Sequence, residues 1–186
     1  MPVAQQLVGI CNAHCWSPGC DRLALCANGS TVLIYGVDSW HTPWQRVATL
    51  DAHRSRVMDV DWSTRSGRIV TCGMDRCCYV WQETVPDRWE PSLVRLDARL
   101  TQLREQASDA HCILWIVTHL PQQAVMQLQL PALCIRWSPD GAVFALGSSD
   151  KSIGVGVLDQ GKTWVVKLVS ICIVSLLAAR AADTGQ

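Results

Sequence analysis

The sequence predicts an all-β protein, an incomplete β-propeller of about three four-stranded blades, on three observations. A tryptophan that closes an alternating apolar segment recurs as Trp16, Trp62 and Trp137, and a turn and a second apolar segment follow it each time. Gly, Asp and Pro cluster in these turns, where the backbone takes a positive or preset φ. Units of roughly 40 to 45 residues have the length of one four-stranded blade.

The middle unit, residues 52–81, shows the elements of a blade most completely. Apolar and polar residues alternate up to Trp62, a turn follows, and a second strand is expected at residues 68–72. Asp75 then precedes a third strand that we expect to end at Trp81. This order and spacing are typical of a WD repeat, so the fold class is an incomplete WD40 β-propeller.

Four polar residues of the middle unit have the spacing of one hydrogen-bonded chain: His53, Thr71, Asp75 and Trp81. The Asp75 carboxylate would orient the imidazole, the imidazole would bond the Thr71 hydroxyl, and the hydroxyl would accept from the indole N–H. A catalytic interpretation, with a His53–Asp75 dyad and Thr71 as the nucleophile, leaves Trp81 unexplained. We therefore expect a structural tetrad and no catalytic residues.

The outer units keep the frame of this repeat but lose its polar network. In the middle unit, Thr71, Asp75 and Trp81 follow the tryptophan by nine, thirteen and nineteen residues. The same offsets from Trp16 and from Trp137 fall on Leu25, Gly29 and Tyr35, and on Leu146, Asp150 and Gly156. Degraded repeats beside an intact one are common in propellers, so no function follows from the loss.

Composition excludes several classes of function. The 186 residues are 49% hydrophobic and 17% charged, which suits a globular protein, and the 16 acidic and 16 basic residues balance. This balance gives no electrostatic footprint for nucleic acid. Ten cysteines without an opening signal segment indicate a reducing compartment and mostly free thiols.

A zinc site near the amino terminus is disfavoured by the spacing of its possible ligands. The possible ligands are Cys11, His14, Cys15, Cys20 and Cys26. Successive cysteines are separated by three, four and five residues, unlike the short pairs of structural zinc sites. Strand alternation would also scatter these side chains over both faces of a sheet. We expect no metal and no cofactor.

An apolar run at residues 168–179 raises the question of a membrane anchor. It holds twelve residues between Lys167 and Arg180, whereas a membrane-spanning helix needs about 20. We expect no membrane partner.

Two strings support a narrower identification than a WD repeat. RIVTCGMDRCCYVW at residues 68–81, followed by WEPSLV at residues 89–94, resembles the second blade of subunit 1 of the actin-related protein 2/3 complex. Residues 11–35 resemble the first blade of that family, and segments within residues 135–167 resemble its third. The resemblance covers about residues 9–97 and 132–167.

The resemblance implies a non-catalytic scaffold subunit of the complex that nucleates branched actin filaments. It implies a cytoplasmic, cytoskeletal location, with the other subunits of the complex and actin filaments as partners. The alternatives are a WD-repeat scaffold of a different multiprotein complex and a truncated product without independent function. An enzyme is disfavoured because the sequence has no Gly-rich phosphate loop, H-E-x-x-H or G-x-S-x-G motif.

The chain departs from the family between the second and third units. Trp62 and Trp137 are 75 residues apart, against 46 for Trp16 and Trp62. We expect blades one and two at residues 9–97, a non-family insertion at 98–131, blade three at 132–167 and a divergent apolar tail at 168–186. The insertion is expected to be helical or irregular, because leucines recur at helical spacing at positions 96, 100 and 103. It is either a partner-binding excursion or sequence foreign to the mature protein.

The resemblance implies seven blades, so four further blades are expected beyond this chain and the open stack should be marginally stable. Partner-binding residues are not assigned. Loop aromatics around Trp40, Pro43 and Trp44, or within residues 87–91, are candidates for interface anchors, and a tryptophan tucked over a blade edge is the alternative.

Overall fold

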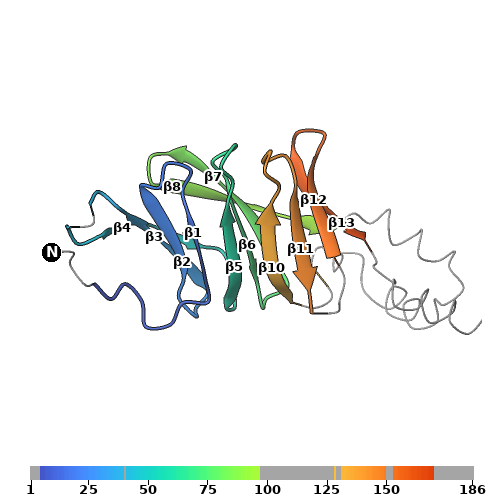
Figure 1. The fold of residues 1–186 in the computed structure, drawn as a ribbon. Coiled ribbons are helices and arrows are strands. Elements are labelled where there is room, and N and C mark those ends of the chain that lie inside the picture. The colour runs from blue at the N-terminus through green and yellow to red at the C-terminus, as the bar shows by residue number, and fades with distance from the viewer. Residues whose placement is uncertain (1–4, 40, 97–127, 129–130, 150–152, 170–186) are drawn as a thin grey trace, which may run out of the picture.

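The computed structural model describes residues 5–39, 41–96, 128, 131–149 and 153–169. Every regular element in these residues is a β-strand, and the strands form three sheets that lie side by side (Figure 1). The prediction of an all-β, incomplete propeller of three blades is confirmed. The expected insertion at 98–131 and tail at 168–186 lie mostly outside the described residues, so their boundaries stay predictions.

The four hairpin-connected strands of each blade form an antiparallel meander, as a propeller blade requires. Blade one holds β1 (Ala13–Trp16), β2 (Arg22–Cys26), β3 (Thr31–Gly36) and β4 (Gln45–Asp51). Blade two holds β5 (Val57–Trp62), β6 (Ile69–Gly73), β7 (Cys78–Val85) and β8 (Arg88–Leu93). Blade three holds β10 (Ala132–Trp137), β11 (Phe144–Ser148), β12 (Ile153–Asp159) and β13 (Thr163–Val169).

Two expectations about secondary structure are wrong, one about where a strand ends and one about a helical pattern. The third strand of blade two does not end at Trp81 but continues to Val85, because it pairs with β8 as far as Arg88. Leu96, expected in a helical pattern, lies in β9 (Arg95–Leu96). This short strand pairs in parallel with β13 and gives blade three a fifth strand. The other two leucines of that pattern lie outside the described residues.

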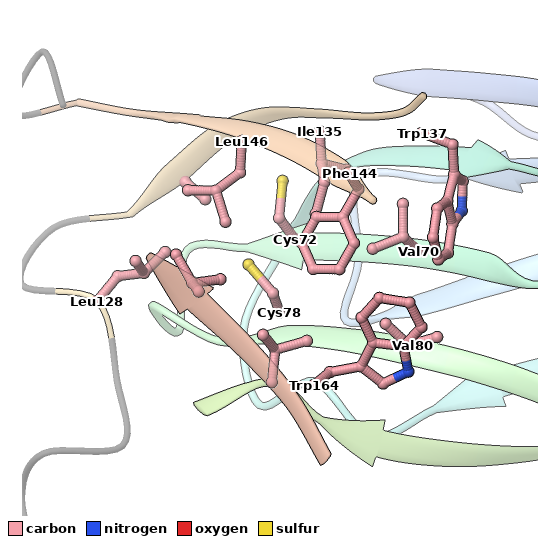
Figure 2. Close-up of a cluster of buried hydrophobic side chains, with 13 residues drawn as sticks. Val70, Cys72, Cys78, Val80, Leu128, Ile135, Trp137, Phe144, Leu146 and Trp164 are labelled. Atoms are coloured by element: carbon pink, nitrogen blue, oxygen red, sulfur yellow. The ribbon is translucent and has the colours of Figure 1, made fainter. Parts of the chain in front are cut away.

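The blades pack face to face, and each blade has two different faces. We call the face that carries the inner-strand tryptophan the front and the opposite face the back. The front of blade two packs on the back of blade one, where the buried back residues are Ala24, Cys26, Val32 and Ile34. The front of blade three packs on the back of blade two in the same way, as Figure 2 shows for Trp137, Phe144 and Trp164 opposite Val70, Cys72, Cys78 and Val80.

A pair of tryptophans joins the inner and outer strands on the front of every blade. Trp16 and Trp44 lie edge to face with ring centroids 5.9 Å apart in blade one. Trp62 and Trp89 in blade two, and Trp137 and Trp164 in blade three, lie edge to face at 5.4 Å. Trp44 and Trp89 therefore pack against the inner-strand tryptophans of their own blades. Trp40 lies outside the described residues.

Blades two and three are also joined by two carboxylates. The buried Asp59 on β5 accepts the backbone N–H of Ile135 at 2.8 Å and also bonds the Arg136 guanidinium. Asp61 accepts the backbone N–H of Trp137 at 2.7 Å. These bonds connect the inner strands β5 and β10, which belong to different sheets. The carboxylates accept the backbone N–H groups that backbone carbonyls would accept within a blade.

Arginines at or just before the start of the second strand reinforce both blade interfaces. Arg22 of blade one bonds Glu83 at 2.7 Å and lies 3.5 Å from Asp87, both in blade two. Arg68 of blade two lies over the Trp164 ring, 5.8 Å from its centroid. Among the residues described, no helix is long and apolar enough to span a bilayer.

The Asp59 bridge predicts a large effect of removing one carboxylate. Asp59→Ala leaves the buried N–H groups of Val60 and Ile135 without their acceptor, which should lower the free energy of unfolding by about 2 kcal/mol. Urea unfolding measures this loss, and amide hydrogen exchange at Ile135 should accelerate. The matched control is Asp38→Ala, since Asp38 is exposed. Equal unfolding midpoints for the two variants would show that the Asp59 hydrogen bonds do not stabilise the fold.

Candidate functional site: the polar tetrad of the middle blade

The four polar residues singled out by their spacing come from four different segments in and next to blade two. His53 lies in the loop between β4 and β5, and Thr71 lies on β6. Asp75 lies in the turn between β6 and β7, and Trp81 lies on β7. Because the blade is a meander, this loop and this turn reach the same end of the sheet. The structure brings all four side chains together there.

The side chains form one continuous chain of hydrogen bonds. The His53 Nδ1 atom is 3.0 Å from both oxygens of the Asp75 carboxylate. The His53 Nε2 atom is 2.9 Å from the Thr71 hydroxyl oxygen, which accepts the Trp81 indole N–H at 2.9 Å. A single assignment of protons satisfies every bond: Nδ1–H donates to the carboxylate, and the hydroxyl donates to Nε2.

Asp75 also holds the backbone of both loops around the imidazole. Its carboxylate accepts the N–H of Arg54 at 2.8 Å and the N–H of Cys77 at 3.1 Å. Gly73 gives the ring its room, because a Cβ there would lie 2.8 Å from His53 Nδ1. The tetrad thus fixes the positions of two loops at one end of the blade.

Burial keeps His53 neutral. Loss of hydration lowers the pKa of His53, and this effect outweighs the attraction of the neighbouring Asp75 carboxylate, which raises it. A neutral imidazole is also what the hydrogen bonds require, since Nε2 must accept from Thr71. The geometry and the electrostatics therefore favour the same tautomer.

The arrangement suits a structural role better than a catalytic one. Thr71 is fully buried, and its hydroxyl is engaged by both His53 and Trp81. A nucleophile needs an oxygen that a substrate can reach, and the Thr71 oxygen is buried and already accepts the Trp81 indole N–H. We propose that these four residues stabilise blade two.

The corresponding positions in the other blades form apolar contacts instead. His53 precedes Trp62 by nine residues, and the same offset falls on Leu7 and Leu128. Leu7 packs with Leu25 and Tyr35, and its carbonyl accepts the Tyr35 hydroxyl at 3.2 Å. Leu128 packs in the buried cluster that contains Leu146. Neither Leu7 nor Leu128 was predicted from the sequence, although both stand nine residues before a repeat tryptophan.

One aromatic ring fills the centre of each front face, but its source differs. Paired residues on the second and third strands are Leu23 and Tyr35, Ile69 and Trp81, and Phe144 and Gly156. In blade three the ring comes from the second strand, and a Cβ on Gly156 would lie 2.0 Å from its Cζ atom. Gly156 stands where blade two has Trp81, and the Phe144 ring on the paired strand fills the space of that indole. Asp150, thirteen residues after Trp137, lies outside the described residues.

The amino-terminal cysteines and histidine do not converge. Cys15 on β1 pairs with Ala24, and Cys26 on β2 pairs with Ala13. Burial raises the pKa of both thiols, and nearby acidic groups raise it further. Within the part of the chain that the structure describes, no three His, Cys, Asp or Glu side chains are placed to hold a metal ion.

Comparison with known proteins places the chain among WD-repeat proteins. The family model described as "WD domain, G-beta repeat" matches residues 44–82 and 124–155. Actin-related protein 2/3 complex subunit 1A of Arabidopsis thaliana is 32% identical over 157 residues, 84% of this chain. Actin-related protein 2/3 complex subunit 1 of Saccharomyces cerevisiae is 29% identical over 154 residues, 83% of this chain.

These alignments cover 33% and 32% of the two relatives, so the chain spans about a third of the length of the curated relatives it matches. Among solved structures, Sqt1 of Saccharomyces cerevisiae has a TM-score of 0.58 and covers 86% of this chain and 34% of its own. At 13% identity this likeness shows the fold alone.

Removal of the Thr71 hydroxyl tests the tetrad. Thr71→Val keeps the shape of the side chain but leaves His53 Nε2 and the Trp81 indole N–H without a partner. We expect a loss of about 2–3 kcal/mol in the free energy of unfolding, because both groups are buried. Thr49→Val, on the exposed side of β4, is the control and should be within about 0.5 kcal/mol of the parent chain. Equal losses for the two variants would contradict the proposed role.

Acid should weaken blade two through His53. Because the folded pKa lies below the unfolded value of about 6.5, the unfolded chain binds protons first as the pH falls. Stability is therefore full above about pH 6.5 and declines below it until the folded pKa is reached. Urea unfolding at pH 7.5 and 5.5 measures the decline, and His53→Gln should reduce it. A decline of the same size in His53→Gln would assign the pH dependence to other groups.

Proposed function

The chain is a WD-repeat protein that is similar along most of its length to subunit 1 of the actin-related protein 2/3 complex, and we propose that it is a non-catalytic scaffold subunit of that complex. In this role it supports the nucleation of branched actin filaments at the cytoplasmic actin cytoskeleton. Its proposed partners are the other subunits and actin filaments, with no nucleic acid and no membrane.

The observation that carries this proposal is the extent of the sequence match. Relatives with this subunit's name in a plant and a yeast align with 84% and 83% of the chain, and the aligned part includes the blade with the intact tetrad. The buried, fully bonded tetrad supports a non-catalytic role, since it leaves no reactive group of its own exposed. The balanced charge of the chain disfavours nucleic acid as a partner.

A scaffold needs a rigid surface, and the tetrad provides one on blade two. Asp75 fixes the loop before β5 through Arg54, and Met74 donates its backbone N–H to the Arg56 carbonyl at 2.8 Å. The two loops therefore lie side by side, with Arg54, Arg56 and Arg76 exposed around Met74, which is 39% exposed. We propose this basic loop surface as a contact for an acidic face of a neighbouring subunit.

Co-purification tests the proposal. The tagged 186-residue chain is expressed in cells, and the recovered proteins are identified by mass spectrometry. We expect recovery of actin-related proteins 2 and 3 and the other subunits of the complex. Recovery of a different stable set of proteins would identify a scaffold of another complex. Recovery of no specific set would favour a product without an independent role.

A charge reversal tests the basic loop surface. Arg54→Glu combined with Arg76→Glu should reduce the recovered subunits at least several-fold, since like charges across an interface repel. Arg88→Glu, at the exposed start of β8, is the control and should recover the same amounts as the parent chain. If the double variant matches this control, the contact lies elsewhere on the blades.

A further inference from the structure

Two cysteines stand directly opposite each other on neighbouring strands of blade two. The register of β6 and β7 pairs Cys72 with Cys78, and both are free thiols. The Cys78 carbonyl accepts the Val94 N–H at 3.0 Å, so the backbone polar groups of Cys78 face β8 and not β6. The two cysteines are therefore a non-hydrogen-bonded pair, in which facing Cβ atoms lie about 4.5 Å apart. A disulfide joins Cβ atoms about 3.5–4.5 Å apart, so the pair is within reach of one.

Blade three covers both sulfur atoms. Cys72 is 0% exposed and Cys78 is 3% exposed. Both side chains point from the back of blade two into the buried cluster that Ile135, Phe144 and Leu146 of blade three complete (Figure 2). Blades two and three are separate sheets, so side-chain packing provides this cover. Access to the two sulfur atoms therefore depends on the docking of blade three.

The docked arrangement keeps the two thiols unreactive. Loss of hydration on burial raises the pKa of both Cys72 and Cys78, and the thiolate is the form that reacts with oxidants. Proteins open locally in cooperative units that often coincide with supersecondary motifs such as a blade. Separation of blade three from blade two returns water to both sulfur atoms and removes the cause of the raised pKa.

We infer that Cys72 and Cys78 are a redox-sensitive pair: when blade three separates from blade two, a hydroperoxide such as hydrogen peroxide oxidises the two thiols to a disulfide. One thiolate attacks the peroxide O–O bond and becomes a sulfenic acid, and the leaving hydroxide takes up a proton as water. The second thiolate attacks the sulfenic sulfur, the S–S bond forms, and a second water leaves. Two electrons pass from the sulfur atoms to the peroxide, so two thiols and one hydrogen peroxide give one disulfide and two waters.

The disulfide encloses the turn between β6 and β7. This turn carries Met74, Asp75 and Arg76, and hydrogen bonds of the Asp75 carboxylate to Arg54 and Cys77 hold it in the reduced chain. Oxidation therefore adds a covalent bond to the corner that holds the carboxylate of the tetrad. A thiol reductant such as dithiothreitol reverses the step by exchange.

Cys77 is a built-in control for the pairing. Its thiol donates to the Asp75 carbonyl at 3.5 Å, and it is not a member of the cluster that holds Cys72 and Cys78. An intact blade two therefore links Cys72 to Cys78 alone, whereas an unfolded chain can link Cys72 to either of the two adjacent cysteines.

Peptide mapping of the purified full chain tests the inference. The chain is treated with hydrogen peroxide, alkylated with iodoacetamide and digested with trypsin. Cleavage after Arg76 places Cys72 and Cys78 in the separate peptides 69–76 and 77–88. We expect these two peptides to be recovered as one disulfide-linked species that dithiothreitol separates.

Two matched variants assign the bond. Cys78→Ala should abolish the linked species, and Cys77→Ala should leave it unchanged. Circular dichroism confirms that each variant is folded, and Cys72→Ala replaces Cys78→Ala if the latter unfolds. A linked species that needs Cys77, or one that survives without Cys78, would overturn the inference.

The control by blade three is tested through the Asp59 bridge. Asp59→Ala removes the hydrogen bonds from β5 to Ile135 and Arg136 on β10, so the linked species should form several-fold faster than in the parent chain. Asp38→Ala, on an exposed side chain, should form it at the parent rate. Equal rates in the two variants, or no linked species in Asp59→Ala, would overturn the inference.

Urea on the parent chain gives a second measurement that needs no substitution. At concentrations below the global unfolding transition, the rate of Cys72–Cys78 linkage should rise while Cys77 stays out of the bond. A rate that rises only within the unfolding transition, with Cys77 and Cys78 linked equally, would show that the whole chain must unfold and would overturn the inference. Both measurements use the chain alone, so their outcomes are independent of the proposed membership in a larger complex.

Discussion

The structure depends on the alternation of side chains along each strand, which gives every blade an aromatic front and a back of small residues. A four-stranded sheet has too little area to bury both faces by itself. The front of one blade is therefore covered by the back of the preceding blade, and this contact buries Trp62 and Trp81 at one interface and Trp137 and Trp164 at the next. Because the two faces differ, the blades stack in a single direction.

The tryptophan pair, and not the polar tetrad, is the feature that all three blades share. Among the described blades, only blade two has the hydrogen-bonded chain of His53, Thr71, Asp75 and Trp81. In blade one, the positions of His53, Thr71 and Trp81 are occupied by Leu7, Leu25 and Tyr35, which pack together. An apolar contact at this place avoids unpaired polar groups, as a complete tetrad does. A half-complete tetrad would be the worst case, and neither outer blade shows one in the described residues.

The sequence could predict the features that follow from local period and spacing. β5 was predicted from the alternation up to Trp62, and the residues of the tetrad from offsets within one repeat. β9 could not be predicted, because two residues carry no period and their partner strand lies at Thr163–Val169. The bonds from Asp59 and Asp61 to β10 join residues more than seventy positions apart in the sequence. No local sequence pattern could therefore predict them. Trp44 and Trp89 were ambiguous because an aromatic residue near a turn suits an interface and a blade face equally.

The long connection between blades two and three does not weaken their contact, because its two ends are anchored. It starts from β9, which pairs with β13, and it returns at Leu128, which is buried and donates its N–H to the Arg76 carbonyl at 3.0 Å. Leu128 stands nine residues before Trp137, as His53 does before Trp62, so blade three begins at the same point of the repeat. Each doubling of loop length costs about 0.6 kcal/mol, and a connection of roughly thirty residues therefore costs about 2 kcal/mol more than one of four. The carboxylate bonds from the buried Asp59 and the half-buried Asp61 to β10 offset a cost of this size.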